Sequence, residues 1–398
     1  MCKLFMKTIS TILAVMSVMS ASTPAAAQEN DNIKIFLNDV ITEQDIHMLL
    51  NNEIRDLMDT VIKNPNSIDI DEDKLKNSYL GSPFSIINES ENGFEKEESI
   101  KYIPIIYDEE ILSLITILKD NGEFFCSVGK SFAPRLNDYL KTFDGSFALV
   151  QTGGGVFVVN EGSSVYTVAD CFNECGTVFS LSAEADLYSQ ISDSDNIVSL
   201  DSLCKNKYPF FQMDSENEEI EFLDAYYADN FLKNYPIVKQ SVSGLCWACV
   251  VASIVMFEKP SVGKLTGEKV SDMVGITYDK GAYYMDIINA LEIYLSSPYD
   301  PWLDPYAMNL DEIKAIIDNN DPACMLCFST KKIDGRTQAH TTALYGYHIN
   351  YNMETSSLSI MEPHNGSKIT VARPANSSFK FVVDNVTFEW DQTIKLYK

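Results

Sequence analysis

The chain has 398 residues, of which 45% are hydrophobic and 11% aromatic, so it is long enough to form two domains with sizeable cores. Its formal net charge is −27. Nucleic acids and anionic membrane surfaces are bound by basic faces, so this acidity argues against both as partners.

The first 27 residues have the layout of a secretory signal peptide. Lys3 and Lys7 precede an apolar run at 9–19, and small residues follow at 24–27. No other stretch reaches the roughly 18 apolar residues that a membrane span needs. We therefore expect a soluble, monomeric protein that is secreted or associated with the cell surface, with no membrane span once the signal peptide is removed.

Charge divides the rest of the chain into two parts. Residues 28–230 carry 13 Lys and Arg against 39 Asp and Glu, a net charge of −26. Residues 231–398 carry 15 against 18, a net charge of −3. We therefore predict a domain boundary near residue 230.

The acidic part is predicted to be a small α+β domain. Apolar residues recur with helical spacing over 42–63, and Thr42 and Asp45 form a capping pair at the start. Short β-rich runs separated by turns over 100–168 predict an antiparallel sheet. Residues 64–99 are polar and are interpreted as a loop or linker.

The acidic segment at 190–230 is predicted to be an exposed linker. A loosely ordered joint of this kind is a good site for a processing protease. We hypothesise that residues 28–230 are a propeptide that acts as an intramolecular inhibitor. The alternative is a permanent accessory domain.

The most informative stretch lies at 239–256. A polar, glycine-containing segment runs into residues that are nearly all apolar or small, which predicts a loop followed by a buried helix. Cys246 lies at the start of that helix. The helix dipole favours a thiolate there, and the thiolate is the nucleophilic form of cysteine.

Three further residues complete a catalytic arrangement around Cys246. Gln240 precedes it by six residues and can donate to a developing oxyanion. His340 begins an apolar strand and is the natural base for a cysteine nucleophile. Glu362 ends the next predicted strand and can hold the imidazole in one tautomer.

These residues resemble the motifs of papain-like cysteine peptidases, in particular the bacterial secreted branch of staphopains, streptopain and domains related to double-glycine-leader peptidases. The resemblance covers about 231–398. It implies that Cys246 is the nucleophile, His340 the general base, Gln240 the oxyanion-hole donor and Glu362 the orienting residue. It implies no cofactor and no metal, and protein or peptide as substrate.

The sequence departs from the family at two positions. The orienting residue is usually Asn or Asp, so Asn365 is an alternative to Glu362. Cys249 replaces a small residue without a thiol, and a reversible disulfide between Cys246 and Cys249 would restrain the peptidase.

Residues 231–398 are predicted to be α+β, with a helical half followed by an antiparallel β-sheet half and a cleft between them. This is the papain-like two-subdomain arrangement, with Cys246 in the helical half and His340 in the sheet half. Helices are predicted at 246–258, 284–295 and 310–319, and strands at 323–329, 340–347, 357–361, 368–372, 379–383 and 387–396.

The predicted function is that of a secreted cysteine endopeptidase made as a zymogen. The same residues in a transglutaminase would transfer the acyl group to an amine. Cys246 and Cys249 also form the C-x-x-C pattern of thiol–disulfide oxidoreductases, although the preceding segment is polar rather than a buried strand. A binding protein with an inactive site is a further alternative.

Other cysteines and histidines are given structural roles. Cys324 and Cys327 with Cys246 and Cys249 would supply four thiols for zinc, but residues three apart on a strand face opposite ways. Cys324 and Cys327 are therefore interpreted as buried cysteines. The remaining histidines are interpreted as surface or packed residues, with His364 near enough to line the cleft; they are His47, His348 and His364.

Overall fold

The protein is described here from a computed structural model. The described residues are 39–90, 93–143, 145–152, 155–160, 165–170, 188, 191, 198–204, 208–209, 227–278, 280–332, 336–351, 355–373 and 378–398. The predicted signal peptide and most of the predicted linker at 190–230 lie outside them. Residues 39–398 form one unit, which is mixed α+β with mainly antiparallel sheets.

The acidic part contains both helices and strands. Its helices are α2 (Glu43–Asn51), α3 (Glu53–Lys63), the 3-10 turn η1 (Pro65–Ser67), α4 (Glu72–Lys76), α5 (Ala133–Leu140) and α7 (Leu200–Cys204). Its strands are β1 (Tyr79–Leu80), β2 (Ile87–Ser90), β3 (Gly93–Lys96), β4 (Ile100–Tyr107), β5 (Glu110–Asp120), β6 (Glu123–Gly129), β7 (Phe147–Thr152), β8 (Gly155–Asn160), β9 (Val165–Asp170) and β10 (Tyr208–Pro209).

The single helix predicted over 42–63 is two helices. The capping box of Thr42 and Asp45 is present as predicted. Asn52, however, has φ −125° and ψ −99°, and its side chain donates to the carbonyl of Met48 at 3.1 Å. This local hydrogen bond competes with the helical one and separates α2 from α3.

Two other predictions for this part need correction. The segment 64–99 is not a plain linker, because it contains α4 and β1–β3. The strands predicted over 100–168 do not form one sheet. Strands β4–β6 belong to the large sheet, whereas β7–β9 pair with β2 and β3 in a five-stranded sheet.

Most of the elements predicted after residue 231 are present. The helices are α8 (Cys246–Glu258), η2 (Pro260–Val262), α9 (Gly267–Val274), α10 (Tyr284–Leu295) and α11 (Leu310–Asp318). The strands are β11 (Tyr227–Phe231), β12 (Asp300–Asp304), β13 (Ala323–Ser329), β14 (Ala339–Asn350), β15 (Thr355–Glu362), β16 (Ser367–Arg373), β17 (Lys380–Val383) and β18 (Val386–Tyr397). Helices α8 and α10 match their predicted bounds, whereas α9, β11 and β12 were not predicted.

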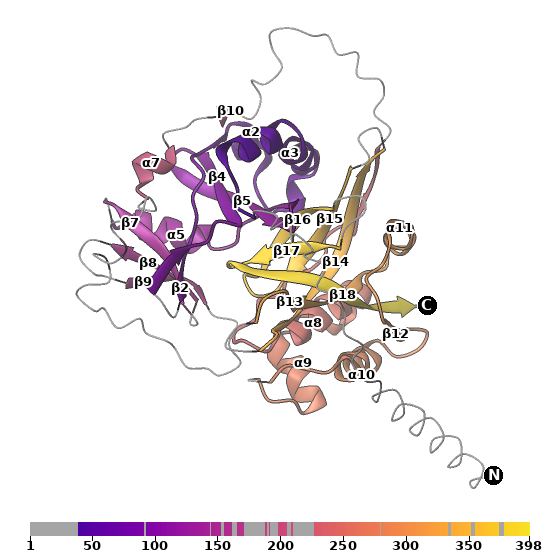
Figure 1. The fold of residues 1–398 in the computed structure, drawn as a ribbon. Helices are drawn as coiled ribbons and strands as arrows, with labels where there is room; N and C mark the ends of the chain where they lie inside the picture. The colour runs from indigo at the N-terminus through magenta and orange to yellow at the C-terminus, as the bar shows by residue number, and fades with distance from the viewer. Residues whose placement is uncertain are drawn as a thin grey trace, which may run out of the picture. The chain divides into compact units, whose positions relative to one another are not determined.

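Strands from both parts of the chain share the large sheet. Its order is β10-β1-β4-β5-β6-β16-β15-β14-β13-β18-β12, with β11 paired to β14 and β17 to β18. The junction is the antiparallel pairing of β6 with β16, in which Gly129 lies opposite Ile369. In Figure 1, the sheet continues from the purple strands β4 and β5 towards the yellow strands β16 and β15. The predicted boundary near residue 230 is therefore not a break in the sheet.

The helices after residue 231 gather against one region of this sheet. Helix α8 contacts α9, α10, β13 and β14 (Figure 1). Its side chains from Trp247 to Val255 are buried within the largest apolar core. Because α8 is apolar all round, it forms the centre of this core and fixes the position of its first residue.

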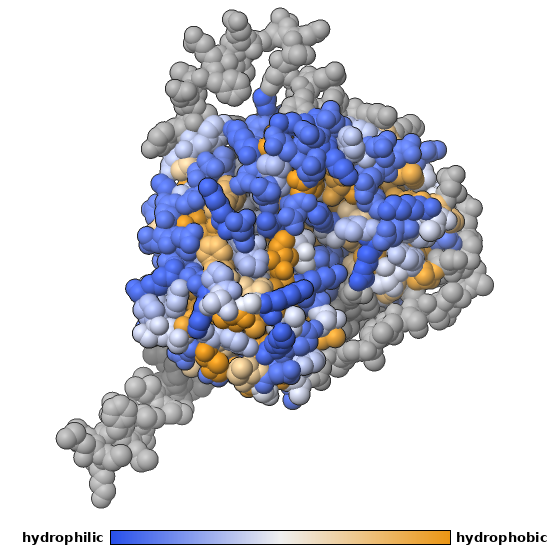
Figure 2. Space-filling model, turned by 180° about the vertical axis from the view of Figure 1, so that it is seen from behind, coloured by the Kyte–Doolittle hydropathy of each residue, from blue (hydrophilic) through white to orange (hydrophobic). Residues whose placement is uncertain are grey.

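The described surface is largely hydrophilic, as the acidic composition predicts. Figure 2 shows charged and polar side chains over most of one face, with apolar side chains in small separate groups. No helix in the described part of the chain is both long and apolar enough to cross a bilayer.

Candidate active site

Cys246 is the first residue of α8, as predicted. Gly244 has φ +92°, a left-handed conformation that glycine adopts without a steric penalty. This conformation changes the direction of the chain just before the helix begins. The residues after Cys246 are buried, while Cys246 itself keeps partial exposure. The sulfur is therefore at a helix N-terminus.

His340 and Glu362 are brought together by two neighbouring strands. His340 lies near the start of β14 and Glu362 ends β15, and these strands are antiparallel with Ala343 opposite Met361. The start of β14 and the end of β15 therefore lie side by side at the same end of the two strands. Nε2 of His340 is 2.9 Å from Oε1 of Glu362, and both side chains are buried.

Cys246 and His340 are joined by a side-chain hydrogen bond. Burial alone would raise the pKa of Cys246, but the hydrogen bond and positive charge of His340 and the backbone N–H of Thr341 lower it below its usual value. Burial would lower the pKa of His340, but Cys246 and Glu362 raise it to about 9. The pair is therefore electrostatically suited to a thiolate facing an imidazolium.

Glu362, rather than Asn365, contacts the imidazole. Its two carboxylate oxygens accept the backbone N–H groups of His364 and Asn365, each at 2.7 Å. Burial would raise the pKa of Glu362, but the hydrogen bond and charge of His340, the charge of His364 and the N–H of Asn365 keep it below its usual value. The side-chain amide of Asn365 turns away and donates to Oδ1 of Asp384 at 3.1 Å.

Gln240 docks onto the loop that follows Glu362. Its backbone N–H donates to the carbonyl of Pro363 at 2.9 Å, and its side-chain Nε2 lies 2.8 Å from Nδ1 of His364. Only 8% of Gln240 is exposed. Gln240 is therefore held by Pro363 and His364, the two residues that directly follow Glu362.

His364, which was expected only to lie near the cleft, contacts Asp384, which sequence analysis did not identify. Nε2 of His364 lies 3.2 Å from Oδ2 of Asp384, and both side chains are buried. Asp384 and Asn385 both have positive φ and form the two-residue turn between β17 and β18. The Asp-Asn pair between two apolar runs is the signal for that turn, but nothing in the sequence indicates that it faces His364.

The other cysteines near the site are buried and reduced. Cys249 lies one helical turn below Cys246, packed against Gly267. Burial is the main cause of the raised pKa values of Cys249, Cys324 and Cys327. Among the described residues, no group of three or more His, Cys, Asp or Glu side chains is arranged to hold a metal.

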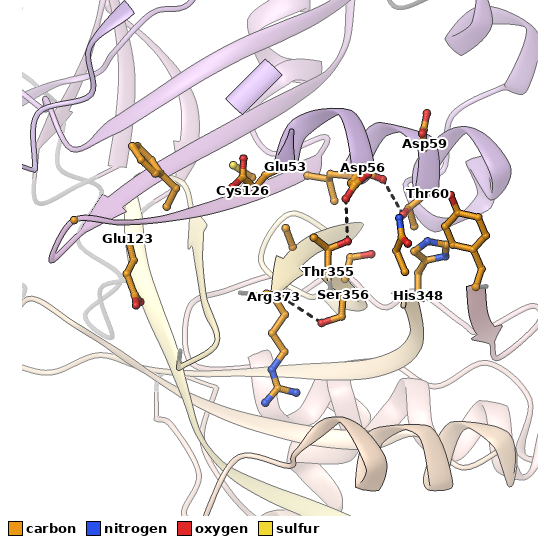
Figure 3. A pocket seen from close by; sticks show the side chains of 17 residues that line it. Glu53, Asp56, Asp59, Thr60, Glu123, Cys126, His348, Thr355, Ser356 and Arg373 are labelled. Atoms are coloured by element: carbon orange, nitrogen blue, oxygen red, sulfur yellow. Dashed lines mark hydrogen bonds between the residues drawn. The ribbon is translucent and has the colours of Figure 1, made fainter. Parts of the chain in front are cut away.

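A cavity of about 350 Å³ lies elsewhere, between α3 and the strands β14–β16 (Figure 3). Carboxylates of Glu53, Asp56 and Glu123 line it together with Arg373. Thr355 donates to Asp56 at 2.9 Å across it. None of the four predicted site residues lines this cavity, so it is separate from the site at Cys246.

No protein-family model matches the chain, and no curated protein matches its sequence significantly.

Proposed function

We propose that the protein is a secreted cysteine endopeptidase made as a zymogen. The observation that supports this most directly is the hydrogen-bonded series Cys246–His340–Glu362, with the sulfur at the start of a buried helix. A thiol, an imidazole and a carboxylate in this order are the components of nucleophilic acyl transfer.

In the proposed reaction the Cys246 thiolate attacks the scissile carbonyl carbon. The carbonyl oxygen becomes an oxyanion, which accepts hydrogen bonds from the backbone N–H of Cys246 and the side chain of Gln240. His340 then gives its proton to the leaving amine, leaving a thioester on Cys246. A water molecule, deprotonated by His340, attacks the thioester and releases the acid.

The proposed architecture is the papain-like one. Cys246 comes from the helical half, α8–α11, and His340 from the sheet half, β13–β18. An extended peptide substrate would lie between the two halves.

We further propose that residues 28–230 inhibit the peptidase until they are removed. Strand β6 pairs with β16 of the sheet that carries Glu362. Ser131 donates to Asp384 and Tyr102 donates to Asn385, each at 3.1 Å, so this part of the chain contacts the turn beside His364. A mature form beginning between about 205 and 236 in the culture supernatant would support processing. Recovery of only the uncut exported chain would favour a permanent accessory domain.

Two alternatives use the same cysteine. An oxidoreductase has no requirement for the hydrogen-bonded His340–Glu362 pair. A transglutaminase would use the same thioester but pass the acyl group to an amine. Mass spectrometry of products formed with and without a primary amine distinguishes hydrolysis from acyl transfer.

The test is active-site labelling of the chain 28–398 and of a shorter chain 227–398, which retains β11. An epoxide inhibitor selective for cysteine peptidases is expected to modify Cys246, and His340→Ala is expected to abolish the label. His47→Ala is the matched control, because His47 is exposed on α2. Labelling that is unaffected by His340→Ala would contradict the proposal.

A further inference from the structure

The side-chain amide oxygen of Gln240 has no hydrogen-bond partner among the described residues. Its Nε2 lies 2.8 Å from Nδ1 of His364, whereas no described residue donates to its buried Oε1. A buried carbonyl oxygen without a donor is unfavourable, and few occur in folded proteins. In this orientation one of the two N–H donors of the amide also faces His364, so only one is left for an oxyanion.

A half turn of the amide about its last side-chain bond gives the oxygen a donor and leaves both N–H groups for a substrate oxyanion. The oxygen and nitrogen exchange places, so Oε1 accepts a hydrogen bond from Nδ1–H of a protonated His364. The NH₂ group is then released from His364. This arrangement requires both nitrogens of His364 to carry protons, because Nε2 already faces the carboxylate of Asp384 at 3.2 Å.

We propose that His364, held by Asp384, is a positioning residue that fixes the Gln240 amide with its NH₂ group free to donate to the substrate oxyanion. The proposal deepens the peptidase function and rests on it, because the oxyanion exists only if Cys246 is acylated. His364 acts through Gln240 and does not touch the reacting atoms.

The electrostatic environment of His364 supports a protonated ring. Burial and the neighbouring positive charge of His340 lower the pKa of His364. The carboxylates of Asp384 and Glu362 act in the opposite direction, and the resulting pKa is above the usual value. The carboxylate of Asp384 contacts the ring directly, whereas that of Glu362 accepts the backbone N–H of His364 at 2.7 Å.

Kinetics of two reactions of Cys246 test the role. Hydrolysis of a peptide amide forms an oxyanion, whereas alkylation by iodoacetamide does not. Gln240→Ala is expected to lower kcat for hydrolysis about 100-fold. His364→Phe is expected to lower it at least about tenfold, to change alkylation less than about threefold, and to have little further effect in the Gln240→Ala background.

His364→Gln is the conservative variant, because its amide can donate to Oε1 of Gln240. It is expected to recover much of the hydrolysis lost in His364→Phe. Additive losses in the double variant, or a parallel fall in alkylation, would overturn the positioning role. The alkylation rate also reports whether each variant retains a folded site.

Histidine-selective ¹⁵N NMR gives a readout that does not depend on activity. The chain has four histidines, and His364→Gln assigns the ring of interest. We expect both ring nitrogens of His364 to be protonated at neutral pH. An unprotonated Nδ1 would overturn the proposed amide orientation. A doubly protonated ring in a processed wild-type form that hydrolyses nothing would instead overturn the peptidase function.

Discussion

The acidity of Cys246 results from opposing effects on one sulfur. Burial favours the neutral thiol, whereas the start of α8, the N–H of Thr341 and the imidazole of His340 favour the thiolate. The stabilising effects outweigh burial, because the pKa of Cys246 lies below its usual value. For Cys249, one turn along the same helix, burial prevails and the thiol stays protonated.

We expect peptide hydrolysis to have a bell-shaped pH dependence. At low pH Cys246 is protonated, so activity rises as the pH passes its lowered pKa. Above about pH 9 His340 loses the proton that the leaving amine requires, so activity falls. Rates of hydrolysis and of iodoacetamide alkylation across pH 4–11 check this. Alkylation should not show the alkaline fall, since it needs no proton donor.

Glu362→Gln is expected to lower the pKa of His340 and shift the alkaline limb to lower pH. The amide keeps the size of the side chain but removes the negative charge that stabilises the imidazolium. We expect kcat to fall by about 10- to 100-fold, the order of an impaired general acid–base group. Glu292→Gln is the matched control, because Glu292 is exposed on α10. An unshifted alkaline limb would contradict the role of Glu362.

The four site residues that sequence analysis named have local signals. Cys246 begins an apolar run, and His340 and Glu362 stand at the ends of predicted strands. The structure places three of them in one hydrogen-bonded series and Gln240 against the adjoining loop. Asp384 has no such signal, since its contact with His364 depends on how the β17–β18 hairpin folds back.

Helices α8 and α9 are in close contact at Gly267. A Cβ atom at Gly267 would lie 2.6 Å from Sγ of Cys249. Alanine normally stabilises a helix relative to glycine. Here the clash with a buried, rigid sulfur opposes that gain.

Gly267→Ala is therefore expected to destabilise the protein by about 1–3 kcal/mol, the usual cost of overpacking a core. Chemical denaturation measures this change. Cys249→Ala removes the sulfur, so the double variant should regain stability relative to Gly267→Ala. A stabilising effect of Gly267→Ala alone would show that α9 moves to make room.

Prediction of the elements succeeded where the hydrophobic pattern is long and strong. Helix α8 is almost entirely apolar and ends before Pro260, and its bounds were predicted correctly. The pattern failed at Asn52, because apolar spacing continues on both sides of the break between α2 and α3. Strand β12 was missed because only five residues, including Pro301 and two aspartates, form it.

At the scale of the whole molecule, the main feature is the sheet shared by both parts of the chain. Only three residue pairs join β6 to β16: Gly129 with Ile369, Val128 with Thr370 and Ser127 with Val371. A Cβ atom at Gly129 would lie 2.9 Å from Cγ1 of Ile369. The junction is therefore short and tightly packed.

Gly129→Val is expected to weaken this junction and destabilise the full chain by about 1–3 kcal/mol. If residues 28–230 inhibit the peptidase, the variant should also react faster with the epoxide inhibitor before any cleavage. Thermal denaturation and the labelling rate of the chain 28–398 measure the two effects.

Ile369→Ala supplies the control, because it removes Cγ1 and makes room for the new side chain. The double variant should label more slowly than Gly129→Val alone. If Gly129→Val is destabilised but does not label faster, the junction contributes to stability and not to inhibition of the peptidase.

The shared sheet has a consequence for how such a zymogen would be switched on. A cut in the segment 210–226 breaks the covalent link but leaves the β6–β16 hydrogen bonds and the contacts of Ser131 and Tyr102 in place. The nicked protein would then remain a complex of two fragments. The delay before full activity would follow the spontaneous dissociation of that complex, a first-order process that adding more processing enzyme cannot accelerate.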